Sequence, residues 1–100
     1  MTHSLAPQAE TDLDDIWLYA AKESGNIETA NRLMDSITSR FVLLARNPYM
    51  GRDRSDDFGH GMRSHAVGAY VIVYCIANDE DVLILRVVDG RRDFEPLFGP

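Results

Sequence analysis

The sequence is poor in cysteine and lysine, and it contains no apolar run of membrane-spanning length. Its only cysteine, Cys75, cannot form an internal disulfide, which favours a reducing compartment over secretion. The opening stretch MTHSLAPQAETDLDD lacks the basic start and apolar segment of a signal peptide. No apolar stretch approaches the roughly 20 residues needed to cross a bilayer. We therefore expect one cytoplasmic domain over residues 1–100, without membrane association.

Familiar catalytic and metal-binding motifs are also missing. No serine lies in a G-x-S-x-G turn, and no G-x-x-x-x-G-K-[ST] loop is present to bind phosphate. The histidines and the cysteine do not pair at the short spacing of zinc ligands. A site built from His60, His65 and either Asp56 or Asp57 is the alternative, but solvated loop side chains explain these residues better. These absences count against classical hydrolase and nucleotidase chemistry, and we expect no metal and no cofactor.

Acidic residues cluster near the start of the chain, at Glu10, Asp12, Asp14 and Asp15. One interpretation is a site for a divalent cation. The other is a solvated first part of a helix, where negative charge suits the positive end of the helix dipole. The second interpretation is favoured because it needs no ligand.

The charge that is present is acidic overall and unevenly spread. The formal net charge is −6, with −5 in residues 1–30, +2 in residues 31–65 and −3 in residues 66–100. A net acidic chain is unlike most proteins that bind nucleic acid through phosphates, so we expect no direct nucleic-acid binding. Nine of the ten basic residues are arginines, which favour planar, bidentate contacts with carboxylates or phosphates.

Hydrophobic spacing predicts an α+β fold. A short extended start precedes a helix that begins at Pro7 and ends near Gly25, and a second helix begins after Asn26 and ends before Pro48. NPYMGRDRSDDFGHG is expected to be a loop. MRSHAV, AYVIVYCIA and VLILRVVD read as three strands in a meander, with turns at Gly68 and NDED. The prediction is an antiparallel helical hairpin on one face of a mainly antiparallel sheet.

The candidate site residues are mostly arginines of this sheet. Arg63 lies near the start of the first meander strand, Arg86 lies inside the last, and Arg91 and Arg92 follow it. We expect Arg63, Arg86 and Arg92 to converge with Tyr74 on one region of the sheet. They either form a site for a phosphate or carboxylate, or make salt bridges to Asp89, Asp93 and Glu95 at a solvated edge. An arginine inside an apolar strand needs a reason, so both alternatives stay open.

Several stretches together resemble ParE-type toxins of the RelE/ParE superfamily, from bacterial type II toxin–antitoxin modules. They are LAPQAETDLDDIWLYAA, NPYMGR, GMRSHAVGAYVIVY and VLILRVVDGRRDFEPLF, and they follow the family order over nearly the whole chain. The resemblance implies a helical hairpin over an antiparallel sheet, which agrees with the fold predicted from periodicity. It also implies a toxin that is neutralised by a ParD-type antitoxin and that inhibits DNA gyrase without catalysing a reaction.

The resemblance also carries an alternative, because RelE-like members cleave messenger RNA on the ribosome. Such a nuclease would place Arg63, Arg86, Arg92 and Tyr74 on the phosphate. Asp89 stands where the superfamily often has a histidine, and an aspartate is deprotonated at neutral pH. It would repel phosphate and serve poorly as a general acid. Asp89 and the absence of lysine after Lys22 therefore favour the non-catalytic branch.

The implied partner is the antitoxin, in a hetero-oligomer of heterotetramer size or larger. It is expected to cover apolar surface on the helical hairpin and to pair with the sheet. Its acidic residues would meet the arginines, and the full set of binding candidates is Arg63, Tyr74, Arg86, Asp89, Arg91 and Arg92. A weaker third possibility is a degenerate toxin that survives only as a binding partner.

Overall fold

The computed structural model describes residues 2–77 and 81–91. Nine elements follow one another along these residues: β1 (His3–Leu5), α1 (Pro7–Ser24), α2 (Ile27–Arg46), the 3-10 helix η1 (Pro48–Met50), β2 (Arg52–Asp53), α3 (Ser55–Phe58), β3 (Met62–Val67), β4 (Tyr70–Ile76) and β5 (Val82–Asp89). Neither long helix is apolar enough to cross a membrane, and this holds for every helix in the described ranges.

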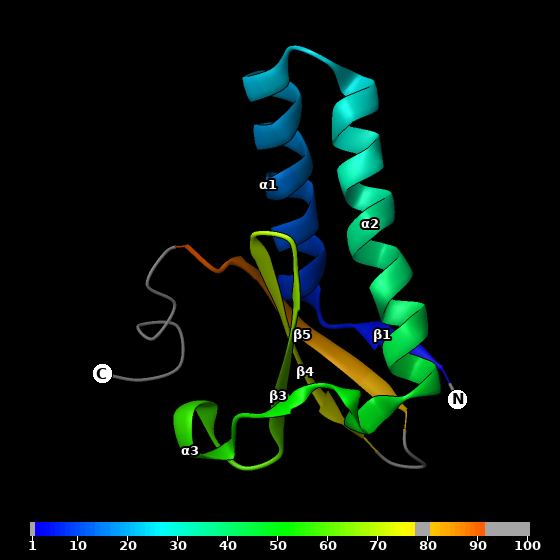
Figure 1. Ribbon diagram of the computed structural model, residues 1–100, viewed down its shortest axis with the longest axis vertical. Helices are drawn as coiled ribbons and strands as arrows, with labels where there is room; N and C mark the ends of the chain where they lie inside the picture. The colour runs from blue at the N-terminus through cyan, green and yellow to red at the C-terminus, as the bar shows by residue number, and fades with distance from the viewer. Residues whose placement is uncertain (1, 78–80, 92–100) are drawn as a thin grey trace.

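The two long helices form the predicted antiparallel hairpin (Figure 1). Gly25 ends α1 in the left-handed conformation at a φ of 64°, which glycine adopts without steric cost. The side chain of Asn26 then accepts hydrogen bonds from the amides of Glu28 and Thr29 and so caps α2. Two adjacent residues therefore end one helix and begin the next, which makes the reversal tight.

Five strands form the sheet in the order β1-β5-β4-β3-β2. The strands β3, β4 and β5 are the predicted antiparallel meander, and β2 adds antiparallel to β3 at one edge. At the other edge β1 pairs parallel with β5, and His3 lies opposite Val82. The fold class predicted from the sequence is confirmed, with the hairpin against a mainly antiparallel sheet (Figure 1).

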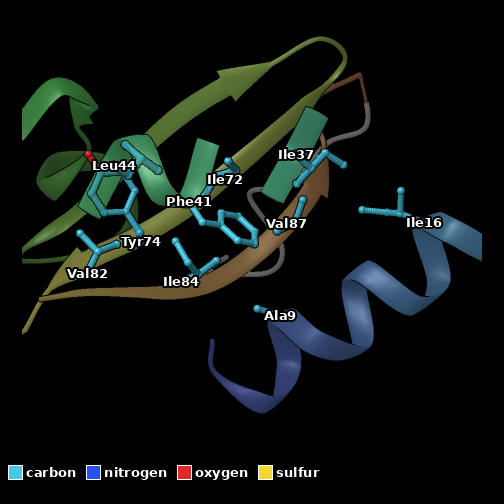
Figure 2. Close-up of a cluster of buried hydrophobic side chains, with 10 residues drawn as sticks. All are labelled: Ala9, Ile16, Ile37, Phe41, Leu44, Ile72, Tyr74, Val82, Ile84 and Val87. Atoms are coloured by element: carbon cyan, nitrogen blue, oxygen red, sulfur yellow. The ribbon is translucent and has the colours of Figure 1, made fainter. Parts of the chain in front are cut away.

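The hydrophobic core lies between the hairpin and the sheet. Figure 2 shows α2 contributing Ile37, Phe41 and Leu44, which meet side chains of β4 and β5. Helical spacing predicts one apolar stripe on α2, and its members are all buried or packed against this cluster: Ala30, Leu33, Met34, Ile37, Phe41, Leu44 and Ala45. The same spacing predicts a stripe of Ala9, Leu13, Ile16, Trp17 and Ala20 on α1, which is only partly buried. Ala9 and Ile16 are buried, whereas Trp17 is half-buried and donates from Nε1 to Oδ1 of Asn31 at 2.8 Å.

The segment predicted to be a loop between α2 and β3 contains η1, β2 and α3. Pro48 starts η1, where its missing N–H removes no hydrogen bond. Oδ1 of Asp53 accepts from the amide of Ser55, and the amide of Arg54 donates to the carbonyl of Met62. These local bonds and the pairing of β2 with β3 hold the segment, and none of the three short elements has a periodic sequence signal. Most of the predicted turn at residues 78–81 lies outside the described residues.

His65 lies on the helix-facing side of β3, opposite the buried Ile72. Its Nε2 is buried, and no hydrogen-bond partner for this atom is found among the described residues. Desolvation lowers the pKa of His65 below its ordinary value of 6.5, and the positive charge of Arg40 on α2 lowers it further. The folded protein therefore favours the neutral imidazole.

The lowered pKa of His65 predicts that the stability of the protein depends on pH. Because the pKa is lowered on folding, the unfolded chain binds more protons than the folded one as the pH falls below about 6.5. The free energy of unfolding should therefore decrease from pH 7 toward pH 5. Thermal unfolding across this range should show a shallower slope for His65→Gln, whereas His60→Gln at an exposed position should keep the wild-type slope. Equal slopes for wild type and His65→Gln would contradict this interpretation.

Candidate functional site

The most strongly bonded polar cluster joins α1 to β5 through Asp12. Its Oδ2 accepts from Nε of Arg86 at 2.8 Å and from the amide of Val87 at 2.9 Å, and its Oδ1 accepts from Nη2 of Arg86 at 3.0 Å. Asp12 is 8% exposed, so this pair is largely removed from water. The hydrogen bonds to Asp12 raise the pKa of Arg86, so the guanidinium stays charged.

A bulge in β5 positions this pair. Opposite the neighbouring residues Val73 and Tyr74, β5 supplies Arg86 and Ile84, so Leu85 is an extra residue. The bulge lies just beyond the end of β1, whose last paired residue, Leu5, faces Ile84. Where β1 ends, α1 runs beside β5, and the carboxylate of Asp12 accepts the backbone amide of Val87. The side chain thereby continues the edge pairing that β1 began.

The pair corrects two expectations from the sequence. The sequence predicts a solvated acidic cluster that includes Asp12, but Asp12 is buried and forms an ion pair with Arg86. Arg86 was expected either at a ligand site or in a salt bridge with Asp89, Asp93 or Glu95, and its partner is Asp12 instead. The spacing held a signal for this: Asp12 follows the buried Ala9 by three positions and precedes the buried Ile16 by four, so it lies on the buried face of α1.

Tyr74 is enclosed on the helix-facing side of the sheet. It is 0% exposed, lies beside Leu44 in Figure 2, and directs its hydroxyl to the backbone around η1. That hydroxyl donates to the carbonyl of Pro48 at 2.8 Å and accepts from the amide of Gly51 at 3.0 Å. A methyl group on Gly51 would collide with this hydroxyl. Tyr74 therefore fixes the segment that follows α2, and it is not available to a ligand.

Arg63 holds the same segment from the surface side. It lies opposite Tyr74 in the pairing of β3 with β4. Its Nη2 donates to the carbonyl of Tyr49 at 3.0 Å and also to the carbonyl of Gly51. Its guanidinium carbon lies 5.4 Å from the centre of the Tyr49 ring, which is a cation–π distance. Arg63 and Tyr74 are thus brought together as predicted, but around the protein's own backbone.

Asp89 and Arg91 form a separate pair at the other end of the sheet. Nη2 of Arg91 lies 2.8 Å from Oδ2 of Asp89, and the arginine side chain is 69% exposed. These contacts raise the pKa of Arg91. Asp89 lies opposite Tyr70, four residues along β4 from Tyr74, which corresponds to about 13 Å. The carboxylate of Asp89 therefore pairs with an arginine of its own chain.

The expected convergence of all four side chains is wrong in its geometry. In an antiparallel meander the start of the first strand lies beside the start of the third strand, not beside its end. Arg63 at the start of β3 therefore lies far from Arg91 after β5. Arg86 is directed toward α1 at the sheet edge, whereas Arg63 is directed toward η1. Arg92 lies outside the described residues.

Sequence reasoning missed an exposed apolar surface at the end of α2 and on η1. We call it the α2–η1 surface; it comprises Val42, Leu43, Tyr49 and Met50, which are 47%, 37%, 64% and 42% exposed. Exposed arginines lie within and beside it, at positions 46 and 52. The sequence predicts only a helix end and a loop here. The signal that could have revealed the surface is the absence of acidic residues over residues 39–52.

The remaining reactive groups offer little chemistry. Burial raises the pKa of the half-buried Cys75 thiol, which disfavours the thiolate needed of a nucleophile. Within the part of the chain that the structure describes, no three His, Cys, Asp or Glu side chains are placed to hold a metal ion. The arrangement is suited to binding through arginines and exposed apolar side chains.

Known proteins are similar to this chain in sequence and in fold. Residues 4–94 match the family described as the ParE toxin of the type II toxin–antitoxin system parDE. Toxin ParE3 of Caulobacter vibrioides is 35% identical over 88 residues, which are 88% of this chain and 85% of that protein. Toxin ParE1 of Mycobacterium tuberculosis is 24% identical over 91 residues, which are 91% of each chain.

Two solved structures have the same fold at 22% identity. The chromosomal ParDE system from P. aeruginosa superposes with a TM-score of 0.74, covering 89% of this chain and 95% of that chain. The RelBE2 toxin–antitoxin complex from Mycobacterium tuberculosis gives a TM-score of 0.66, covering 88% and 95%. One likeness is to a ParDE system and the other to a RelBE complex, so the fold alone does not separate these two groups of proteins.

Asp12→Asn should destabilise the protein strongly. An amide cannot match both guanidinium donors and the Val87 amide, so a partly buried charge loses its partner, at a cost on the order of 3 kcal/mol. Urea unfolding measures this change directly. The control is Asp14→Asn on the same helix at an exposed position, which should change stability by less than about 0.5 kcal/mol. Similar stabilities for the two variants would contradict the role given to Asp12.

Tyr74→Phe should destabilise the protein by about 1–3 kcal/mol, because the Pro48 carbonyl and the Gly51 amide would both lose their buried partner. Thermal and urea unfolding provide the measurement. Tyr49→Phe removes the same hydroxyl from a side chain that is 64% exposed and should be close to neutral. An unchanged stability for Tyr74→Phe would show that the hydroxyl does not fix η1.

Proposed function

Because this chain belongs to the ParE family of type II toxin–antitoxin toxins, we propose that it inhibits DNA gyrase and is neutralised by a ParD-type antitoxin. The match over residues 4–94 and the 35% identity to a ParE3 toxin are the observations that carry this proposal. The likeness to a ParDE system agrees in fold. We place this activity in the cytoplasm. The complex with the antitoxin is proposed to be a hetero-oligomer of at least heterotetramer size.

We also propose that the toxin acts by binding and not by catalysis. A RelE-like nuclease would need Tyr74 and Arg86 on an RNA phosphate. Tyr74 is 0% exposed with its hydroxyl bonded to backbone groups, and Arg86 is bonded to Asp12. Arg63 donates to the carbonyls of Tyr49 and Gly51, so three of the four side chains required by the nuclease alternative already have partners inside the protein. The carboxylate of Asp89, paired with Arg91, is a poor source of a catalytic proton.

The proposal predicts inhibition of gyrase in a purified system. Toxin at micromolar concentration should block supercoiling of relaxed plasmid by gyrase, and an equimolar amount of the antitoxin encoded beside the gene should restore it. The antitoxin alone serves as the control. Full supercoiling in the presence of folded toxin would remove the gyrase part of the proposal.

A parallel measurement addresses the nuclease alternative. After induction of the toxin without antitoxin, ribosome-bound messages should remain intact while growth stops. Codon-positioned cuts in these messages would favour a RelE-like nuclease. Unchanged growth would favour the degenerate toxin, provided that the protein accumulates in folded form.

A further inference from the structure

The α2–η1 surface combines exposed apolar side chains with an excess of positive charge. Residues 39–52 contain three arginines and no acidic residue, in a chain whose net charge is −6. Val42 and Leu43 precede Arg46 by four and three positions, so these three side chains are neighbours on α2. Tyr49 and Met50 are the exposed apolar residues of η1, which follows α2 directly, and Arg52 is the first residue of β2. Such a concentration of exposed apolar residues with one sign of charge is typical of a binding surface.

The backbone of this surface is held in place by the buried Tyr74 and the half-buried Arg63. Arg63 bonds to the Tyr49 carbonyl and lies against its ring, while Tyr74 bonds to Pro48 and Gly51 on either side. Tyr49 is therefore exposed by 64% yet fixed at its backbone. A rigid exposed aromatic side chain loses little conformational entropy on binding, which favours affinity. Arg63 thus acts as a positioning residue for this surface.

We propose that the α2–η1 surface binds an acidic segment of the antitoxin that carries bulky apolar side chains. This inference rests on the proposed function, because it assigns a place on the toxin to the antitoxin. Carboxylates of the segment meet Arg46 and Arg52, and its apolar side chains cover Tyr49 and Met50. Among the described strands, the adjoining β2 lies at the edge of the sheet, which gives an extended segment a strand to pair with.

The composition of the surface favours a protein segment over single-stranded RNA. Sequence-tolerant RNA binding uses several aromatic side chains on which successive bases stack. Here Tyr49 is accompanied by valine, leucine and methionine, which suit apolar side chains of a protein. The net charge of −6 also weakens attraction to a polyanion at long range, whereas a short acidic segment responds to the local arginines.

The test compares two double variants with the same change in net charge. Arg46→Glu with Arg52→Glu reverses the charge at the surface, and Lys22→Glu with Arg32→Glu reverses two exposed charges near the tip of the hairpin. Affinity for the antitoxin encoded beside the gene is measured by calorimetry at two salt concentrations. We expect the surface variant to raise the Kd at least tenfold and to weaken its salt dependence. The hairpin variant should stay within about threefold of wild type.

The apolar half of the surface is tested in the same way. Tyr49→Ser with Met50→Ser should raise the Kd at least tenfold, while Leu18→Ser with Tyr19→Ser, at similarly exposed positions on α1, should not. Circular dichroism and thermal unfolding confirm that each variant is folded. Equal effects of surface and control variants, or no effect of either, overturn the inference and leave the proposed function standing.

Two other outcomes are informative. If unmodified toxin does not bind the antitoxin, the inference and the neutralisation part of the proposed function fall together, whereas gyrase inhibition is tested separately. A single-stranded RNA of about 16 nucleotides provides the second comparison. Tight RNA binding that the arginine variant abolishes, with unchanged antitoxin affinity, would overturn the inference in favour of an RNA surface.

Discussion

The fold depends on one carboxylate. Asp12 accepts hydrogen bonds from Nε and Nη2 of Arg86 and from the Val87 amide, at the point where β1 no longer pairs with β5. Without it, a charge and a backbone donor at the sheet edge would lose their partner, and α1 would lose its polar contact to the sheet. Because the hairpin reverses tightly at Gly25 and Asn26, fixing α1 also fixes α2 over the core. The position of η1 follows from α2.

Local signals in the sequence predicted most of the fold, whereas contacts between distant elements were harder. Gly25, Asn26 and Pro48 set the helix ends through their own backbone preferences, so a single sequence reveals them. The partner of Arg86 could not be read locally, because it lies 74 positions away. The bulge at Leu85 was also hidden, since nothing in an apolar run marks the extra residue. The expected convergence of Arg63 and Arg86 with Tyr74 on one site therefore fails, because their partners lie in distant elements.

The arginines divide into two groups that composition alone does not separate. Arg63 and Arg86 serve the protein's own structure, one fixing η1 and the other completing the edge of β5. Arg46 and Arg52 are exposed beside apolar side chains. Arg63 and Arg86 thus belong to the framework, whereas Arg46 and Arg52 lie on a surface that this framework supports.

The parallel pairing of β1 with β5 has a consequence for synthesis. Thr2 and Asp81 are hydrogen-bonded although they stand 79 positions apart, and Asp12 bonds to Arg86, which lies 74 positions later. Residues 2 and 12 therefore find their partners only at residues 81 and 86. The sheet edge and the α1 contact form only after residue 86 has been translated, because contacts of such long sequence separation require both partners. A nascent or prematurely terminated chain that ends before Arg86 lacks this architecture, so the helical hairpin is made long before the sheet edge that anchors it.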